Sequence, residues 1–311
     1  MGLKLRPNQQ FAAITYLDNS GDSNYHAAQF TLRRRFSSGL GLSLAYTYGK
    51  SIDNQSVDPV GAASGGGLST TNSRTPTDIR NFRDERGRSD FDRTQVLQAA
   101  SVWEVPVGKG KRFLRSSHGV VNHLLGGWTI NSISTFMTGE PFAVRSGSFT
   151  ANGSHESRAG VQLPIQAQLQ YLTGQTFAGP VLFKPVAFNA TGNPATCGVD
   201  LTQAFCLPVP GTNGAGRNIF TAPHYWNLDL GFIKTLQLTE RFKLQFRTEM
   251  FNALNHANFD NPRDASSGSP SIRSSVFAQT CCAAVAPPST QTIVQTGESA
   301  RVIQFALKLQ F

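Results

Sequence analysis

The residue types that most often carry chemistry are scattered along this chain of 311 residues. Six histidines occur, but none falls at the spacing of a metal site or a catalytic triad. A glycine-rich run at residues 61–67 lacks the Gly-Lys-Ser/Thr continuation of a phosphate-binding loop, so it predicts a flexible loop. We therefore expect neither enzyme activity nor a cofactor. The histidines are His26, His118, His123, His155, His224 and His256.

Two of the four cysteines are close neighbours in polar, loop-like sequence. Cys197 and Cys206 have eight residues between them, and no C-x-x-C motif or nearby histidine accompanies them, which argues against a zinc site. In an exported protein such a pair favours a local disulfide. A catalytic thiol is less favoured, and two free thiols remain an alternative. Adjacent Cys281 and Cys282 could pair only through a strained turn, so their state stays open.

Two polar clusters each allow a functional and a structural interpretation. Acidic residues at the base of one expected loop could bind calcium, but nearby arginines favour salt bridges instead. A second cluster could form a ligand platform, although we expect it to satisfy backbone groups where a strand ends. The first cluster is Asp84, Glu85, Asp90 and Asp92, with Arg83, Arg86, Arg88 and Arg93; the second is Asn252, Asn255, His256 and Asn258.

The elements that must position these residues are strands, because side-chain character alternates with period two. In residues 40–49 one face carries Leu and Tyr, and the other carries Gly, Ser, Ala and Thr. The same alternation recurs six more times, with Ile133 as a local exception. The predicted strands are Tyr25–Phe36, Leu40–Gly49, Arg93–Val105, Gly127–Met137, Trp226–Phe232, Phe242–Met250 and Ile303–Phe311.

The connections between these strands differ greatly in length. Those at Ser37–Gly39 and around Thr239 are short, and Pro106–Gly126 is intermediate, whereas the others are long. Outer-membrane barrels combine short periplasmic turns with long external loops. The long connections are expected at Ser51–Asp90, Arg145–Pro223 and Asn255–Ser299.

Strand length also favours a membrane setting. About eleven residues tilted by ~40° span about 27 Å, close to the ~25 Å apolar band of such barrels. A soluble β-sandwich has shorter strands and charges on its outward face. We therefore predict an all-β, transmembrane antiparallel β-barrel in the outer membrane, represented by about seven C-terminal strands with long extracellular loops. Membrane lipid is then one partner.

Charge and hydropathy agree with this prediction. The net charge is +9 and the pI about 9.7, but the basic residues are dispersed and Arg33–Arg35 is the only tight run. No nucleic-acid motif accompanies them, so we expect no nucleic-acid partner. No apolar run approaches the ~18 residues of a membrane-spanning helix, and the mean hydropathy of −0.23 is compatible with barrel strands.

Several longer motifs resemble the barrel of Oar-like TonB-dependent receptors, and the resemblance runs from about Tyr16 to Phe311. It is carried by Asn24–Leu40, Glu85–Asp92, Gly139–Phe142, Tyr225–Leu230, Leu244–His256, Asn258-Phe259 and the Phe-terminated last strand. The family implies a barrel of about 22 strands around a plug, energised by the TonB system.

The resemblance implies that residues 1–311 are the C-terminal portion of such a barrel. No plug, energy-coupling segment, signal peptide or N-terminal barrel strands are recognised, and residues 1–23 have no assigned role. We therefore expect a stretch of receptor wall, inactive alone, that serves uptake of a metal chelate or an oligosaccharide. The TonB system would act through the missing N-terminal part. The alternative is a small self-standing porin or adhesin-like barrel that uses Phe11–Tyr16 as an eighth strand.

The last strand resembles the signal by which the barrel-assembly machinery recognises its substrates. Alternating hydrophobic residues lead to a terminal aromatic residue, and such an edge strand can add to another sheet edge. The plainer interpretation, a closing strand of the barrel, is compatible with this role. The signal residues are Ile303, Phe305, Leu307, Leu309 and Phe311.

Overall fold

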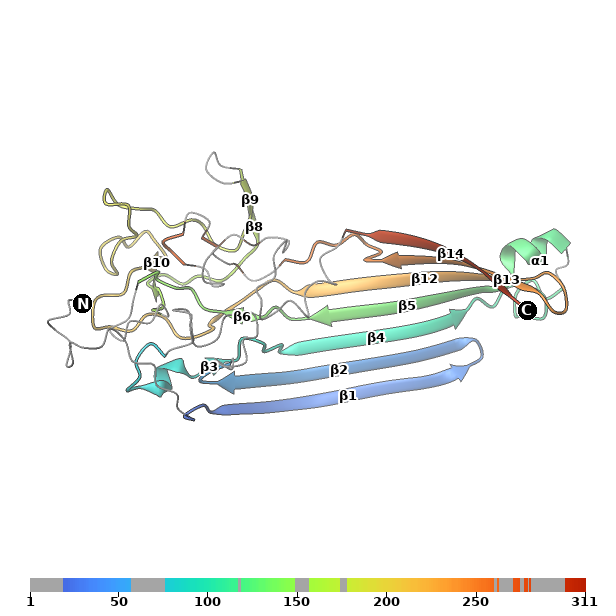
Figure 1. Cartoon of the computed structure of the whole chain (residues 1–311), viewed down its shortest axis with the longest axis horizontal. Helices are drawn as coiled ribbons and strands as arrows, with labels where there is room; N and C mark the ends of the chain where they lie inside the picture. Colours follow the sequence, from blue (N-terminus) through green and yellow to red (C-terminus); the bar gives the residue numbers. More distant parts are fainter. Residues whose placement is uncertain are drawn as a thin grey trace, which may run out of the picture.

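One long antiparallel sheet dominates the computed structural model (Figure 1). Seven long strands follow one another in chain order, and each pairs with the next. The residues that the structure describes are 19–56, 76–116, 119–148, 157–173, 178–259, 262, 271–274, 277–278, 280 and 300–311. The strands are β1 (Ser23–Ser37), β2 (Leu40–Asp53), β4 (Gln95–Glu104), β5 (Trp128–Met137), β12 (Tyr225–Gln237), β13 (Lys243–Phe251) and β14 (Val302–Gln310).

All seven strands expected from the sequence are present, which confirms the all-β antiparallel fold class. The largest boundary errors concern β2 and β12, which continue to Asp53 and Gln237, past the ends that alternation indicated. Within the described residues the longest α-helix, α1 (Gly119–Leu125), has seven residues, and none is long and apolar enough to span a bilayer.

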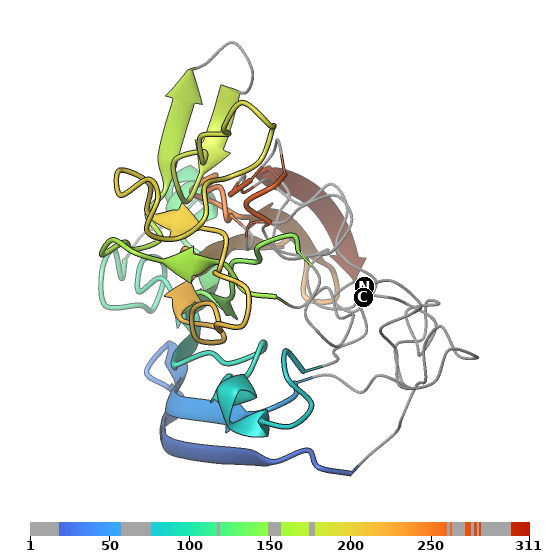
Figure 2. The same ribbon diagram turned by 90° about the vertical axis from the view of Figure 1, so that its left-hand side faces the viewer.

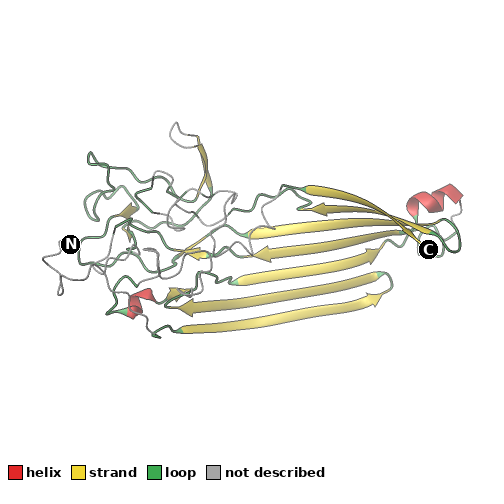
Figure 3. Cartoon of the chain, in the orientation of Figure 1, coloured by secondary structure: helices red, strands yellow, loops and turns green. Residues whose placement is uncertain are grey.

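Short and long connections lie at opposite ends of the sheet. The β1–β2 turn, the β12–β13 turn and α1 are at one end, together with the last residue of the chain (Figures 1 and 3). The long connections are at the other end, where the 3-10 helix η2 (Phe82–Glu85) and the short strand β3 (Gly87–Arg88) extend the edge of β2. We call these the turn end and the loop end. This arrangement is the one that the connection lengths predicted.

Strand register gives the sheet one predominantly apolar face. Directly paired residues of adjacent strands lie on the same face, so rows can be followed across the sheet. One such row crosses five strands and is made entirely of large apolar side chains: Phe30, Tyr46, Leu97, Phe136 and Trp226. Many residues of this face are exposed; Phe305 and Leu307, for example, are 67% and 68% exposed. A face of this kind is suited to lipid.

The opposite face is made mostly of polar and small side chains. One row across four strands is Ala45, Gln98, Thr135 and Asn227. Ile133 lies on this face, where it is paired with Ala100 and Asp229, so the local exception in its strand is real. The sequence alternation therefore predicts both faces correctly.

The buried core lies outside this sheet, in a lobe at the loop end. There the short strands pair as β6 with β11, β7 with β10, and β8 with β9. The sequence predicted a long connection over residues 145–223 but recognised none of the short strands within it. The strands are β6 (Pro141–Phe142), β7 (Gly160–Val161), β8 (Gln170–Thr173), β9 (Ala178–Val181), β10 (Phe205–Cys206) and β11 (Phe220–Thr221).

The long sheet is open within the described part of the chain. Strands β1 and β14 are its outermost members, and each pairs with one neighbour only. Seen along the strands, the sheet bends into an arc with β1 and β14 at its two ends (Figure 2).

Candidate functional site

The polar face carries mixed charges, concentrated on β13 and its partner β14. Lys243, Arg247 and Glu249 alternate along β13, and Lys308 follows the same face on β14. The Arg247 guanidinium donates a hydrogen bond to the Glu249 carboxylate, with 2.6 Å between Nη2 and Oε1. Long charged side chains in this arrangement are typical of a wall that faces a water-filled interior.

Buried ion pairs attach the lobe to the loop end of the sheet. Arg217 contacts Asp53 at 2.5 Å and Asp90 at 3.3 Å, and Arg158 contacts Glu85 at 2.9 Å. Both guanidinium groups are nearly inaccessible to solvent. Since removing one partner of a buried pair leaves an uncompensated charge, these contacts hold the lobe in one position.

A further ion pair lies where β3 meets β2. The Arg88 guanidinium donates to the Asp92 carboxylate at 2.8 Å and to the Thr221 hydroxyl at 2.8 Å. Asp92 in turn accepts a hydrogen bond from the Ser51 backbone N–H at 2.7 Å. This junction therefore joins three segments that are far apart in the sequence.

Salt bridges are present in the acidic cluster, where Glu85, Asp90 and Asp92 each contact an arginine. No group of histidine, cysteine or acidic residues within the described part of the chain could hold a metal ion. The partners were only partly predicted, because Arg86 pairs with Asp22 and Arg93 pairs with Glu140. The main partners, Arg158 and Arg217, lie far downstream in the sequence, and no local sequence pattern predicts their ion pairs.

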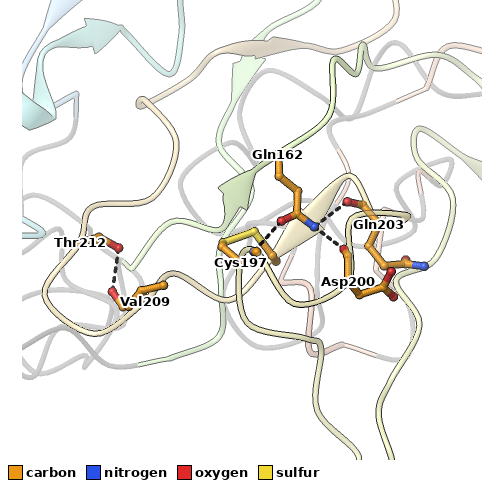
Figure 4. The surroundings of a disulfide bond; sticks show 8 residues. Gln162, Cys197, Asp200, Gln203, Val209 and Thr212 are labelled. Carbon is orange, nitrogen blue, oxygen red and sulfur yellow. Dashed lines mark hydrogen bonds between the residues drawn. A yellow bond between two sulfur atoms is a disulfide. The ribbon is translucent and has the colours of Figure 1, made fainter.

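A disulfide closes a small loop in the lobe (Figure 4). The sulfur atoms of Cys197 and Cys206, the pair for which the sequence favours a local disulfide, lie 2.01 Å apart. Gln162 holds the loop from outside: its amide nitrogen donates to the carbonyl oxygens of Asp200 and Gln203, and its oxygen accepts from the Gly198 N–H. The tip is thus rigid and leaves Val199 76% and Leu201 65% exposed.

Aromatic residues form the centre of the lobe. The ring of Phe183 lies 4.9 Å from that of Phe205 and 5.0 Å from that of Phe220, both in edge-on contact. Such pairs add about 0.5–1.5 kcal/mol each beyond the area that they bury. The sequence contained one sign of this core, since four of its buried phenylalanines occur in segments interpreted as long connections: Phe183, Phe205, Phe220 and Phe277.

The second polar cluster satisfies backbone groups, as expected. The Asn258 side chain accepts from the Trp226 N–H at 2.9 Å and donates to the Trp226 carbonyl at 3.1 Å. Asn252 bonds to both backbone groups of His256, and Asn255 accepts from the Arg301 N–H. The ligand-platform alternative has no support, because these amides already stabilise the end of the sheet.

The His256 ring packs against Trp226, with 4.3 Å between the ring centroids. Partial burial in this position lowers the pKa of His256 below its usual value of 6.5. The neutral ring is therefore favoured at physiological pH.

The predicted assembly-signal residues lie along β14 and just beyond it. Ile303, Phe305, Leu307 and Leu309 share the apolar face, and Phe311 follows the strand and is 96% exposed. Among described residues β14 pairs with β13 alone, so its outer edge has the geometry that edge recognition requires. The signal role itself stays a prediction.

Three predictions lie outside the described residues. These are the flexible glycine-rich run at residues 61–67, the possible extra strand at residues 11–16, and the state of Cys281 and Cys282.

Comparison with known proteins gives one match. The sequence model of a family described as "Outer membrane beta barrel domain" matches residues 2–304, nearly the whole chain. Searches of curated proteins and of solved structures found no match.

Proposed function

The chain belongs to the outer membrane beta barrel domain family and is a protein of the outer membrane, and we propose that it forms part of the wall of a wide barrel that imports a bulky nutrient. The proposal follows the TonB-dependent receptors that the chain resembles. It has three parts: a wide lumen, a ligand-facing lobe and an external energy source.

The charged polar face is the observation that carries the proposal. A barrel of about eight strands has an interior just wide enough for side chains. The polar rows here include Lys243, Arg247, Glu249 and Lys308, which need water or a polar filling around them. A wider barrel supplies that space, and its further strands would pair with the outer edges of β1 and β14.

The folded lobe supports a role in ligand binding. Loops at this end of outer-membrane barrels face the outside, and function often lies in loops held by a rigid scaffold. Here the scaffold is the phenylalanine core, the disulfide and the ion pairs of Arg158 and Arg217. Exposed Val199 and Leu201 at the rigid tip are suited to contact the apolar part of a ligand.

The remaining parts of the proposal rest on the resemblance alone. We propose the TonB system as the energy source, the barrel-assembly machinery as the insertion partner, and a metal chelate or an oligosaccharide as the cargo. No chemical step on the cargo is proposed, so the protein would act as a receptor and not as an enzyme.

Uptake in living cells tests this function. Cells that carry the protein in their outer membrane are offered labelled metal chelates and oligosaccharides too large for general porins. We expect import of one ligand class that stops when a protonophore collapses the proton gradient. Import that continues in the presence of the protonophore, or an unselective ion-conducting pore, would contradict the proposal and favour the small-porin alternative.

A matched pair of variants refines the test. Leu201→Ser at the lobe tip should raise the ligand concentration for half-maximal uptake several-fold. Leu238→Ser is the control, because Leu238 is 55% exposed but lies in the β12–β13 turn at the opposite end. Equal effects from both variants would argue against the lobe as the ligand-facing surface.

A further inference from the structure

The connection between β4 and β5 folds into a compact unit at the turn end. Its first half is a tight loop in which the Gly108 N–H donates to the Phe113 carbonyl at 3.0 Å. The second half contains α1 (Gly119–Leu125), and the two halves are joined where the Lys109 N–H donates to Asn122 Oδ1 at 2.7 Å. We call residues 105–116 and 119–126 the turn-end foot.

The foot is attached to the apolar face of the sheet. Lys234 on β12 and Trp128 on β5 are direct register partners, and Lys234 belongs to the row of Trp226, Leu228, Leu230 and Phe232, which alternation assigns to the apolar face. The Lys234 ammonium donates to the carbonyl oxygens of Leu124 at 3.1 Å and of Gly126, and the Trp128 indole N–H donates to the Leu124 carbonyl at 3.0 Å. The C-terminal end of α1 is therefore fixed on the side of the sheet that faces lipid.

The helix turns its apolar side chains outward. Val120 is 72% exposed and Leu124 is 65% exposed, and Val121 and Leu125 are also exposed. Exposure of these four apolar side chains to water is unfavourable. No other part of the described chain covers them.

The same foot carries a concentrated positive charge. Residues 105–128 contain four lysines and arginines and no acidic residue, and all four are exposed. Lys111 pairs with Glu104 at 2.8 Å, both partly exposed, which leaves a clear excess of positive charge. The cations are Lys109, Lys111, Arg112 and Arg115.

Aromatic and basic residues continue this surface along the turn end of the apolar face. Trp103 lies opposite Leu40, and Arg34 lies opposite Leu42. Tryptophan with lysine or arginine is the usual side-chain pattern where an apolar span meets lipid headgroups. The foot is thus continuous with the membrane-facing surface of the sheet.

We propose that the turn-end foot binds the phospholipid surface of the leaflet at the turn end. The helix α1 lies in the plane of the interface with Val120, Val121, Leu124 and Leu125 among the first carbons of the acyl chains. The four cations contact lipid phosphates, with a preference for anionic headgroups. A lipid surface fits better than a protein partner, because the apolar residues and cations adjoin the lipid-facing sheet.

Photo-crosslinking in intact cells tests the proposal. A photoreactive amino acid replaces Val121 in the outer-membrane protein, and the adducts are identified after irradiation. Replacement of Phe305, on the apolar face of β14, marks a residue in contact with the bilayer, and replacement of Val199 marks an exposed apolar residue at the loop end. We expect phospholipid adducts from positions 121 and 305 and none from position 199. A protein adduct at position 121, or no adduct there while position 305 still labels lipid, would overturn the proposal.

The charges are tested by the lipid that accompanies the purified protein. The variant Lys109→Gln/Arg112→Gln/Arg115→Gln should retain several-fold less phosphatidylglycerol than the unchanged protein. Lys184→Gln, Arg83→Gln and Arg273→Gln, all exposed at the loop end, form the matched control and should leave this amount unchanged. Equal loss in both variants would overturn the claim that the foot selects anionic headgroups. This experiment and the uptake assay fail independently, since lipid binding needs no cargo.

Discussion

Individual side chains hold the lobe of this protein in place, and buried ion pairs are the most consequential of them. Arg217 is the clearest example, because it joins a residue at the end of β2, Asp53, to the distant lobe. Asp53 is almost completely buried. Its charge is tolerable only while the guanidinium stays beside it.

Substitution of Arg217 should therefore loosen the lobe strongly. Arg217→Ala leaves the Asp53 carboxylate buried and unpaired, which costs about 3–5 kcal/mol. Arg86→Ala is the control, because the Arg86–Asp22 pair is exposed on both sides and contributes about 0–1 kcal/mol. Limited proteolysis of the folded protein should cut the lobe much faster in Arg217→Ala only. Similar rates in both variants would contradict a structural role for the buried pair.

The disulfide stabilises a smaller part of the same lobe, the loop between Cys197 and Cys206. We expect peptide mapping without reductant to recover Cys197 and Cys206 in one crosslinked fragment. Cys197→Ser should destabilise the lobe by about 2–3 kcal/mol, since the closed loop is short and its closure entropy is modest. Two thiols that react with an alkylating agent in protein taken from cells would contradict the pairing.

His256 provides a test by pH. Its folded-state pKa is lowered by burial, so the unfolded chain binds more protons than the folded one as the pH falls below the usual value of 6.5. The local structure should therefore lose stability on acidification through that range and keep it above. Histidine NMR on the folded protein should place the pKa of His256 below 6.5; a value at or above 6.5 would contradict the observed packing on Trp226.

At the scale of single elements, one face of each strand is suited to lipid and the other to water. Leu244 lies on the apolar face and is paired with Leu309, whereas Gln245 lies on the polar face and is paired with Lys308. The two residues are adjacent in the chain, yet they meet different solvents. The strand β13 therefore allows a comparison in which only the face changes.

Arginine at these two positions should have unequal effects. Leu244→Arg places a charge in the lipid band and should cost about 2–4 kcal/mol if it lies near the bilayer midplane. Gln245→Arg faces the aqueous interior and should cost little. The measurement is the folded yield of each variant in the outer membrane. Equal loss from both would show that the sheet does not have one lipid face and one aqueous face.

Long strands could be predicted from the sequence because their signal is local. Residues 40–49 reveal both faces by simple alternation, and the register later joins them into rows. The lobe could not be predicted in this way, since Phe142 and Phe277 share one core although 135 positions separate them in the numbering. The helix α1 was missed because its seven residues, which begin with Gly119, give too short a pattern.

For the candidate site as well, contacts between residues near in sequence could be predicted and contacts between distant residues could not. The cysteine pair and the backbone-satisfying asparagines were found because their partners are near in sequence or their role is fixed by a strand end. The roles of Arg158 and Arg217 were not predicted, because their carboxylate partners are distant in the sequence. Ion pairs also produce no periodic pattern in the sequence. Lys234 lies beyond Phe232, where the predicted strand ended, and its bonds to α1 are visible only in the structure.

At the scale of the whole molecule, the central feature is a lipid-suited sheet with two outer edges. Backbone groups in the hydrocarbon must all be hydrogen-bonded, and each one left unsatisfied costs several kcal/mol. Strands β1 and β14 each pair on one side only within the described chain. Several unpaired groups on each edge together exceed the ~5–15 kcal/mol by which a typical domain is stable. We therefore propose that further strands pair with these edges and complete the wall.

Refolding of residues 1–311 by themselves tests this central claim most directly. The chain is folded into detergent micelles or liposomes, and its migration is compared before and after heating, together with the protease resistance of its strands. We expect aggregation and no heat-modifiable monomer, because the outer edges of β1 and β14 have no partners among the described residues. A compact, monomeric species with protected strands would contradict the account, and the small self-standing barrel would then replace the wide receptor wall.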